Sequence, residues 1–377
     1  MLGPYEALKG EIIKYKGNKI FPEIKNIKKV PISISEIKNR VFSLHNQEIW
    51  PAISRINNQI NISVNNYFNK VVGALFVPLP LTTRMISSPG AVYGKEAINY
   101  TTDTVPITLK WFELPKKAFL AESSQIYLEL ALLQKGINHV FANYNSFRKE
   151  KADATHLSEF HHIEYEGKID QKKNIKIAQG LLYTIINDLI KNNDSDLSVF
   201  LTDEKISELK QTTRKNIPII TFEEALNLLY DETKDKKYKK FTLQTFHSWE
   251  EVKLTEIIGR TVGVSEMPLL EVPFYHAMKD GTEPPVADNT DIILSGYREI
   301  VGSGHRVRSI KELEEKARIF NLPREDYIPY LQSRQFPDYK ETSGFGLGWE
   351  RFMQGILEMP FIHTVCLFPR IDQTLKP

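Results

Sequence analysis

Three glycines alternate with apolar residues just before a predicted helix near the end of the chain. In GFGLGWER, Gly344, Gly346 and Gly348 would let a flat ligand lie close to the backbone of a strand. Arg351 falls in the first turn of the helix, where its charge opposes the helix dipole. An anionic ligand explains this position, and so does a structural salt bridge. A dinucleotide fingerprint does not fit, because too little chain follows for the βαβ unit that such a motif opens.

A polar loop between two strand-like segments concentrates groups that recognise nucleotides. The stretch FRKEKADATHLSEF carries Arg148, Glu150, His156, Glu159 and Phe160. Arginine and histidine at the mouth of a hairpin can clamp a phosphate, and an aromatic ring can stack on a base. A charged surface hairpin has the same composition, so spacing alone leaves both interpretations open.

Two carboxylates are candidate ligands of a divalent cation. Asp291 and Glu299 flank a turn at Gly296, and Mg²⁺ commonly takes one or two carboxylates together with substrate phosphates. The doublet His161–His162 is rejected as a metal site, because neighbouring residues on a strand point to opposite faces.

The elements that position these groups alternate between helices and hairpins. Hydrophobic periodicity predicts helices over 46–72, 171–195, 309–319 and 349–359. Strands are predicted in a hairpin over 139–166 and over 272–278, 291–295, 298–302, 344–348 and 363–368. The charged segment 231–240 is expected to be a surface loop. Because no regular βαβ repeat occurs, the pattern indicates an α+β fold with a mostly antiparallel sheet flanked by helices.

Composition gives weaker signals about location and partners. The formal charge of +2 does not by itself indicate a nucleic-acid-binding protein. A lysine-rich N-terminal stretch is interpreted as a solvated face or a weak phosphate-binding arm, and it comprises Lys9, Lys14, Lys16, Lys19, Lys25, Lys28 and Lys29. The single Cys366 excludes a disulfide framework within one chain and favours a reducing cytoplasm. No apolar run reaches eighteen residues, so we expect no membrane span.

Taken together, three separated segments resemble the class II aminoacyl-tRNA synthetases, specifically the asparaginyl and aspartyl branch. AESSQIYLELAL followed by FRKEKADATHLSEFHHIEYE is similar to the substrate loop and second motif of that branch. DIILSGYREIVGSGHR is similar to its metal-binding strand pair, SGFGLGWERF to its third motif, and VPLPLT weakly to its first. The resemblance covers roughly residues 50–377. It implies a class II catalytic domain at 46–377, preceded by a short basic extension at 1–45.

The resemblance also implies ATP- and Mg²⁺-dependent formation of an aminoacyl-adenylate, with a role for each matching residue. The ATP-binding set comprises Arg148, Glu150, His156, Phe160 and Arg351. The amino-acid-binding set comprises Ser123, Gln125, Glu164 and Arg334. The metal ligands would be Asp291 and Glu299. Arg148 and Arg351 would be catalytic, because in-line attack on the α-phosphate needs positioning and neutralisation of the developing charge.

Two positions favour asparagine over aspartate as the amino acid. Leu128 stands where aspartyl enzymes carry a lysine for the side-chain carboxylate, and Glu164 stands where they carry aspartate. A carboxamide needs no ammonium partner, and a glutamate can accept its N–H. Departures from the family pattern lie close by, at Thr155, Arg298 and the segment 341–344.

The acceptor of the activated amino acid is open. We expect asparagine activation and transfer to a small amine or other nucleophile, because residues 1–45 are too short for the family's five-stranded anticodon-binding barrel. The alternatives are a minimal asparagine-tRNA ligase, a tRNA-independent asparagine synthetase that joins aspartate and ammonia, and a non-catalytic nucleotide-binding regulatory paralogue. A tRNA partner is possible but not favoured. The family further implies a cytoplasmic homodimer without membrane association.

Overall fold

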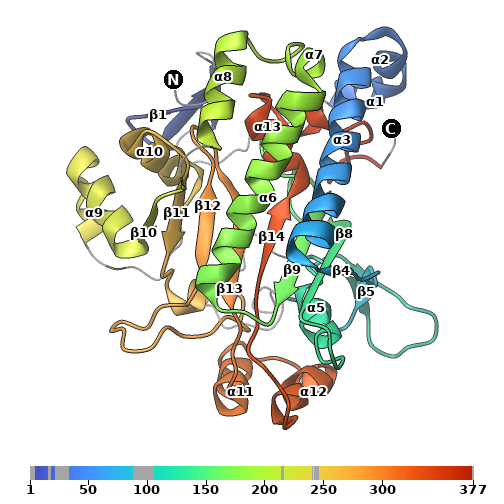
Figure 1. Cartoon of the computed structure of the whole chain (residues 1–377), viewed down its shortest axis with the longest axis vertical. Helices are drawn as coiled ribbons and strands as arrows, with labels where there is room; N and C mark the ends of the chain where they lie inside the picture. Colours follow the sequence, from blue (N-terminus) through green and yellow to red (C-terminus); the bar gives the residue numbers. More distant parts are fainter. Residues whose placement is uncertain are drawn as a thin grey trace.

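One large sheet forms the centre of the structure. The computed structural model describes residues 5–15, 18–21, 34–87, 106–213, 216–239, 241 and 246–375. The eight strands lie in the order β10 (Ile219–Thr221), β11 (Val262–Ser265), β12 (Thr290–Ile293), β13 (Glu299–His305), β14 (Ser343–Gly348), β9 (Glu159–Gly167), β8 (His139–Phe147) and β4 (Leu75–Phe76) (Figure 1). All neighbours pair antiparallel except the outermost pairs, β10 with β11 and β8 with β4. The predicted α+β fold with a mostly antiparallel sheet is confirmed.

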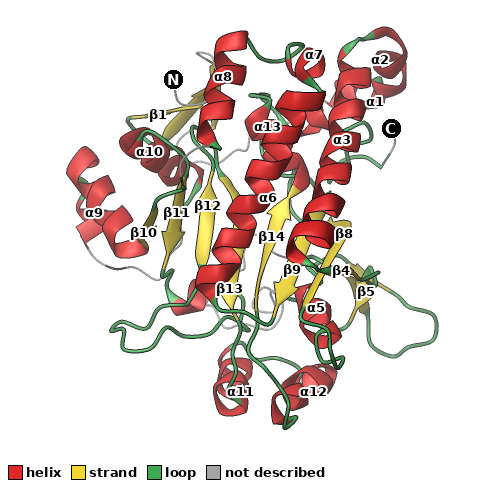
Figure 2. Ribbon diagram, in the orientation of Figure 1, coloured by secondary structure: helices red, strands yellow, loops and turns green. Residues whose placement is uncertain are grey.

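Two long helices lie side by side across one face of this sheet (Figure 2). α3 (Ile49–Asn66) continues into the π-helix η2 (Tyr67–Val72), which ends at Gly73 with a φ of 75° that favours glycine. α6 (Gln171–Asn192) begins after Asp170, whose carboxylate accepts the backbone amide of Lys173 at 2.7 Å. Both helices bury an apolar stripe against the sheet, and the predicted helices 46–72 and 171–195 are therefore confirmed.

Shorter elements surround the sheet. The other α-helices are α1 (Ile34–Lys38), α2 (Arg40–Asn46), α5 (Gln125–Ala131), α7 (Asp194–Leu197), α8 (Asp203–Thr212), α9 (Phe222–Thr233), α10 (Ser248–Ile258), α11 (Ile310–Ile319), α12 (Arg324–Gln332) and α13 (Trp349–Ile356). Short 3₁₀ turns are η4 (Lys236–Lys239), η5 (Leu269–Glu271), η6 (Ser333–Gln335) and η7 (Ile362–Val365). A small sheet joins β5 (Thr82–Thr83), β7 (Ala118–Leu120) and β6 (Thr108–Leu109). Within the described ranges, no helix is long and apolar enough to cross a membrane.

The N-terminal residues form a second small sheet, made of β1 (Tyr5–Leu8), β2 (Ile12–Tyr15) and β3 (Asn18–Phe21). β1 packs on α10, where the Trp249 indole donates to the carbonyl of Leu8 at 2.8 Å. Tyr5 and Tyr15 are buried beneath the sheet. Of the N-terminal lysines, Lys9 is exposed and Lys14 partly exposed. Outside the described residues lie Lys16, Lys25, Lys28, Lys29 and the side chain of Lys19.

The predicted hairpin over 139–166 is present as β8 and β9, and its register fixes the site. Ile163 and Tyr165 pack into the core beneath the two long helices, so Phe160, His162 and Glu164 face the other side of the sheet. β14 lies next to β9 and places Gly348, Gly346 and Gly344 opposite His162, Glu164 and Glu166, respectively. At Gly344 a Cβ would collide with the Glu166 carboxylate, which explains why this position needs glycine.

Three predicted segments differ from the structure. Residues 272–278 form isolated bridges instead of a strand, because Pro273 provides no N–H and Phe274 to Ala277 are buried without alternation. The apolar run 363–368 begins inside the short helix η7, between Pro360 and Pro369, and forms no strand. The charged segment 231–240 is largely helical rather than a loop. It holds the end of α9 and η4, which is anchored by the buried Tyr238 donating to Glu250 at 2.8 Å.

Candidate active site

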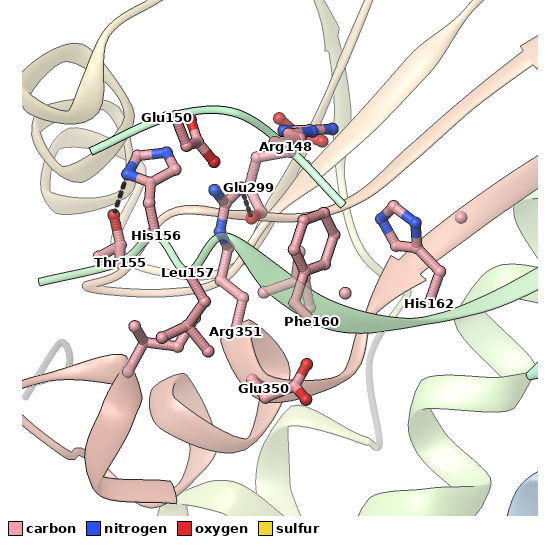
Figure 3. A pocket seen from close by; sticks show the side chains of 14 residues that line it. Arg148, Glu150, Thr155, His156, Leu157, Phe160, His162, Glu299, Glu350 and Arg351 are labelled. Atoms are coloured by element: carbon pink, nitrogen blue, oxygen red, sulfur yellow. Dashed lines mark hydrogen bonds between the residues drawn. The ribbon is translucent and has the colours of Figure 1, made fainter. Parts of the chain in front are cut away.

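One pocket collects most of the predicted nucleotide-binding residues. It opens on the face of the sheet opposite α3 and α6, and Arg148, Glu150, His156, Phe160, Glu299 and Arg351 all line it (Figure 3). These side chains come from the β8–β9 hairpin, β13 and the start of α13, which are far apart in the sequence. The structure therefore brings together the three segments that sequence analysis selected, and the hairpin is part of a pocket rather than an isolated charged surface.

Two arginines face this pocket without an acidic partner. The backbone amide of Arg148 donates to the carbonyl of Ser158 at 3.0 Å, and its guanidinium carbon lies 5.4 Å from the centre of the Phe160 ring. Arg351 donates to the backbone carbonyl of Glu299 at 3.1 Å. No carboxylate among the described residues forms a salt bridge with either arginine, so the structural salt bridge considered for Arg351 finds no support. An anion in the pocket would supply the missing negative charge.

A third arginine, in the turn between β12 and β13, contacts two residues that line the pocket. Arg298 donates to the Thr155 hydroxyl at 2.6 Å and lies 3.3 Å from Nε2 of His156. Its Nε donates to the Glu251 carboxylate at 2.7 Å. Burial alone would lower the pKa of Arg298, but Glu251 outweighs it and raises that pKa. In the sequence, Thr155 and Arg298 stand out only as departures from the family pattern, because nothing there indicates that they touch.

The two predicted metal ligands face a common point over Gly302. A Cβ on this glycine would lie 3.2 Å from Oε1 of Glu299 and 3.8 Å from Oδ1 of Asp291. Burial and the nearby charge of Glu299 raise the pKa of Asp291 well above its usual range. A divalent cation would relieve both effects, so the pair fits Mg²⁺. No group of three or more His, Cys, Asp or Glu side chains in the described part of the chain is arranged to hold a metal.

The predicted amino-acid-binding residues lie further along β9, in a more deeply buried network. Ser123 donates to Oε1 of Glu164 at 2.7 Å, and Gln125 donates to Oε2 of Glu166 at 2.6 Å. Arg306 pairs with Glu166 at 2.9 Å, with both side chains almost fully buried. Burial raises the pKa of Glu164 to about 7. The network is therefore assembled before any substrate binds.

Two atoms of this network remain without partners. Nη1 of Arg306 and Oε2 of Glu164 are buried and form no hydrogen bond within the described residues. Unpaired buried polar atoms are costly, and such atoms in a pocket are candidates for contact with a ligand. Arg306 was not among the predicted site residues, although it is the last residue of the GSGHR segment that carried part of the resemblance.

Two further residues selected from the sequence lie outside the nucleotide pocket. Arg334 is buried in a salt bridge of 2.6 Å with Glu129, whose charge also interacts with Glu166 and Arg306 of the amino-acid network. Leu128 is fully buried in an apolar cluster with Val140 and Tyr144, between α5 and the sheet. As predicted, His161 and His162 point to opposite faces of the strand: His161 pairs with Glu350, and His162 lines the nucleotide pocket.

Comparisons with known proteins agree with this geometry. The family model for tRNA synthetases class II (D, K and N) matches residues 34–372. Asparagine--tRNA ligase of Borreliella afzelii is 26% identical over 336 residues, which cover 86% of this chain and 71% of that protein. The same enzyme of Pyrococcus furiosus is 29% identical over 272 residues, which cover 71% of this chain and 60% of that protein.

Solved structures give the same picture. Asparaginyl-tRNA synthetase from Pyrococcus horikoshii, complexed with asparaginyl-adenylate, superposes with a TM-score of 0.80 at 25% identity, covering 97% of this chain and 79% of that one. The Entamoeba histolytica enzyme has a TM-score of 0.77 at 22% identity, covering 93% and 74%, and supports the fold alone. Since the family match spans most of the chain, from α1 past α13, this protein belongs to the class II tRNA synthetases of the D, K and N group and is an ATP-using, adenylate-forming ligase.

Proposed function

We propose that the chain activates asparagine with ATP and transfers it to a small amine. The α-carboxylate of asparagine attacks the α-phosphorus, the bond to the bridging oxygen of the β-phosphate breaks, and pyrophosphate leaves. One observation carries the proposal: a single pocket combines two arginines without acidic partners, the Phe160 ring and the carboxylate of Glu299. Next to it, Arg306 and Glu164 offer a buried donor and a buried acceptor that suit an amide.

The nucleotide would lie along the hairpin and the start of α13. Phe160 offers a ring for adenine, and Glu150 has an unpaired buried carboxylate oxygen that suits the adenine amino group. Arg148 would bind the α-phosphate, and His156 and Arg351 would bind the outer phosphates. Asp291 and Glu299 would hold Mg²⁺, which neutralises phosphate charge when bound.

The amino-acid pocket matches a carboxamide better than a carboxylate. The free Nη1 of Arg306 can donate to the amide oxygen, and the free Oε2 of Glu164 can accept from the amide nitrogen. Glu166 already neutralises Arg306. An aspartate carboxylate would therefore meet the charge of Glu164 without a spare cation, which is unfavourable in a buried site.

The role that sequence analysis gave to Leu128 changes in this structure. Because Leu128 packs in an apolar cluster, a lysine at this position would bury a charge among aliphatic side chains. We therefore expect Leu128→Lys to destabilise the protein and not to give a clean test of amino-acid choice. Glu164 and Arg306 are the better positions for that test.

The proposal of a small-amine acceptor rests on the burial of two tyrosines in the N-terminal sheet. Base recognition needs exposed aromatic platforms, but Tyr5 and Tyr15 of this sheet are buried and donate to backbone carbonyls near α13. A second candidate is asparagine-tRNA ligase, favoured by the names of the relatives. A third is aspartate amidation by ammonia, because a carboxyl such as Glu164, whose pKa is raised to about 7, can be protonated and donate to a carboxylate.

We also propose a homodimer through the β4 edge of the main sheet. β4 is the outermost strand, and Val71, Leu75 and Phe76 expose more than half of their surface there. An exposed apolar edge strand is a ready site for pairing with a second copy. Sedimentation at micromolar concentration should give a dimer that Phe76→Asp weakens, and a monomeric unmodified protein would rule this out.

Pyrophosphate exchange with each of the twenty amino acids tests the activation step. We expect Mg²⁺-dependent exchange with asparagine well above exchange with aspartate. Product mass analysis with glycinamide, ammonia and total tRNA then identifies the acceptor. Stronger exchange with aspartate would favour the amidation reaction, and charging of asparagine tRNA that depends on its anticodon would favour the tRNA ligase.

A further inference from the structure

His162 occupies the middle of the candidate active site, and no part of the activation step uses it. It lines the nucleotide pocket beside Phe160 (Figure 3). On β9 it lies between Phe160 and Glu164, on the same face of the strand. Alternate residues on a strand lie ~7 Å apart. With adenine on Phe160 and the amino-acid side chain at Glu164, the phosphate and carboxyl groups of the adenylate would lie over His162.

The two ring nitrogens of His162 have different surroundings. Nδ1 lies 2.8 Å from the hydroxyl oxygen of Ser146 and 3.7 Å from Oε1 of Glu164. Nε2 has no hydrogen-bond partner among the described residues. The side chain is 14% exposed, and because it lines the pocket, we assign that exposure to the pocket. A ring held at one nitrogen and open at the other is the arrangement of a positioned proton acceptor.

We propose that His162 is the general base of the transfer step, in which a primary amine attacks the carbonyl carbon of the aminoacyl-adenylate. This inference rests on the proposed function and deepens it. The new C–N bond forms, the bond from the carbonyl carbon to the phosphate oxygen breaks, and AMP leaves with that electron pair. The proton lost by the amine goes to Nε2 of His162, which requires that Nδ1–H donates to Ser146.

The charges around His162 favour a ring that becomes a stronger base after the adenylate has formed. Burial, followed by the charges of Arg148, Arg351 and His161, lowers the pKa of His162 to about 3 in the pocket without nucleotide. The other polar groups that face the ring are Glu164 on its own strand and Ser146 and Tyr144 on β8. In the adenylate, the α-phosphate still pairs with Arg148, whose charge lowers the pKa of His162 more than that of Arg351 does, so this pairing raises the pKa. The imidazole is therefore neutral beforehand and becomes more basic once the adenylate has formed.

The test compares two half-reactions in the same preparations. ATP–pyrophosphate exchange reports adenylate formation, and single-turnover mixing of preformed adenylate with glycinamide reports transfer. His162→Met removes the proton acceptor at similar volume, and His162→Gln keeps a hydrogen-bonding group toward Ser146. His161→Met on the opposite face is the matched control, and melting temperatures verify folding.

We expect His162→Met and His162→Gln to lower transfer ~100-fold more than they lower exchange. Both should also remove one ionisation from the pH dependence of transfer, whereas His161→Met should keep the ratio of the unmodified protein. Hydroxylamine, a strong nucleophile that is largely unprotonated at neutral pH, should be affected less than glycinamide. Equal losses in both half-reactions would make His162 a packing residue and overturn the proposal.

Two further results separate this inference from the proposed function. An unmodified protein that exchanges pyrophosphate but transfers nothing to glycinamide overturns the role of His162 and leaves activation standing. An unmodified protein that exchanges with no amino acid overturns the proposed function and this inference together.

Discussion

The two halves of the active site handle charge in opposite ways. In the nucleotide half, Arg148 and Arg351 face the pocket with no acidic partner among the described residues. In the amino-acid half, Arg306 is paired with Glu166 and almost fully buried, and Arg334 is paired with Glu129 in the same way. The first half is arranged to take its negative charge from the ligand, and the second is neutral before the ligand arrives.

Under the proposed function, this difference follows from what each ligand brings. ATP carries several charges, so guanidinium groups without partners gain strongly when it binds. A carboxamide is neutral, so any unpaired charge in its pocket would remain uncompensated after binding. The nucleotide half should therefore govern turnover, whereas the amino-acid half should govern both stability and selectivity.

The largest effect is expected on stability, from breaking the buried pair. Arg306→Met leaves the Glu166 carboxylate buried without its cation, which should cost about 3–5 kcal/mol of the free energy of unfolding. The matched control is Arg324→Met, in the exposed pair of Arg324 with Glu314 at 2.8 Å, where about 0–1 kcal/mol is expected. Urea unfolding of both variants measures the difference. Equal losses would mean that the amino-acid half is no more dependent on its pairing than the surface is.

The next effect is expected on turnover, from the nucleotide half. Arg351→Ala removes a cation without leaving an acid unpaired, so the melting temperature should change little while pyrophosphate exchange falls by about 100-fold. Arg318→Ala is the control, because Arg318 is 79% exposed on α11, away from the pocket. Exchange that survives the loss of Arg351 would show that this arginine does not contact the nucleotide.

A smaller effect is expected on selectivity, through Glu164. Its pKa is raised to about 7 by burial, so the folded state binds this proton more tightly than the unfolded state does. The group therefore contributes stability at low pH that is lost as the pH rises through about 7. Above that pH the carboxylate accepts from an amide, and below it the neutral acid tolerates a carboxylate.

The preference for asparagine over aspartate should accordingly increase about tenfold as the pH rises through the pKa of Glu164. Glu164→Gln should fix the preference at its low-pH value and remove this pH dependence. The ratio of kcat/KM for the two amino acids, measured from pH 6 to 8.5, provides the comparison. A ratio that is flat in the unmodified protein would place Glu164 away from the substrate side chain.

The nucleotide half could be predicted from the sequence better than the amino-acid half, for a physical reason. Arg148, Glu150, His156 and Phe160 lie within one hairpin, so local spacing already implied their proximity, and the structure places them in one pocket. The Arg306–Glu166 pair joins residues 140 positions apart. Only the strand register of β9, β14 and β13 brings these two residues together.

The strength of the local pattern also explains the errors in the predicted secondary structure. Helices 46–72 and 171–195 have long apolar stripes and were predicted well. Segments 272–278 and 363–368 are short apolar runs next to prolines, and such runs do not distinguish a strand from other buried backbone. Leu128 shows the limit for single residues, because the resemblance implied a role in amino-acid choice while its side chain packs in an apolar cluster.

The smallest effect is expected on ATP affinity, from replacing Arg298. This arginine is paired with an acid, as in the amino-acid half, but it lies at the wall of the nucleotide pocket. Its guanidinium is shared between the Glu251 carboxylate and the Thr155 hydroxyl at the pocket wall. Because Glu251 already offsets its charge, Arg298 should assist the outer phosphates less than Arg351 does. Arg298→Gln should raise the KM for ATP about fivefold, which corresponds to one hydrogen bond of roughly 1 kcal/mol.

A loss of ATP affinity could also follow from general damage, because Arg298→Gln leaves Glu251 buried without its partner. AMP distinguishes the two causes, since it shares the adenine and α-phosphate contacts but lacks the outer phosphates. If Arg298 contacts the outer phosphates, inhibition by AMP should stay the same while the affinities for ATP and pyrophosphate both fall, and Arg298→Lys should restore part of the loss. If AMP, ATP and pyrophosphate all weaken by the same factor, Arg298 acts only by holding Thr155 and His156 in place.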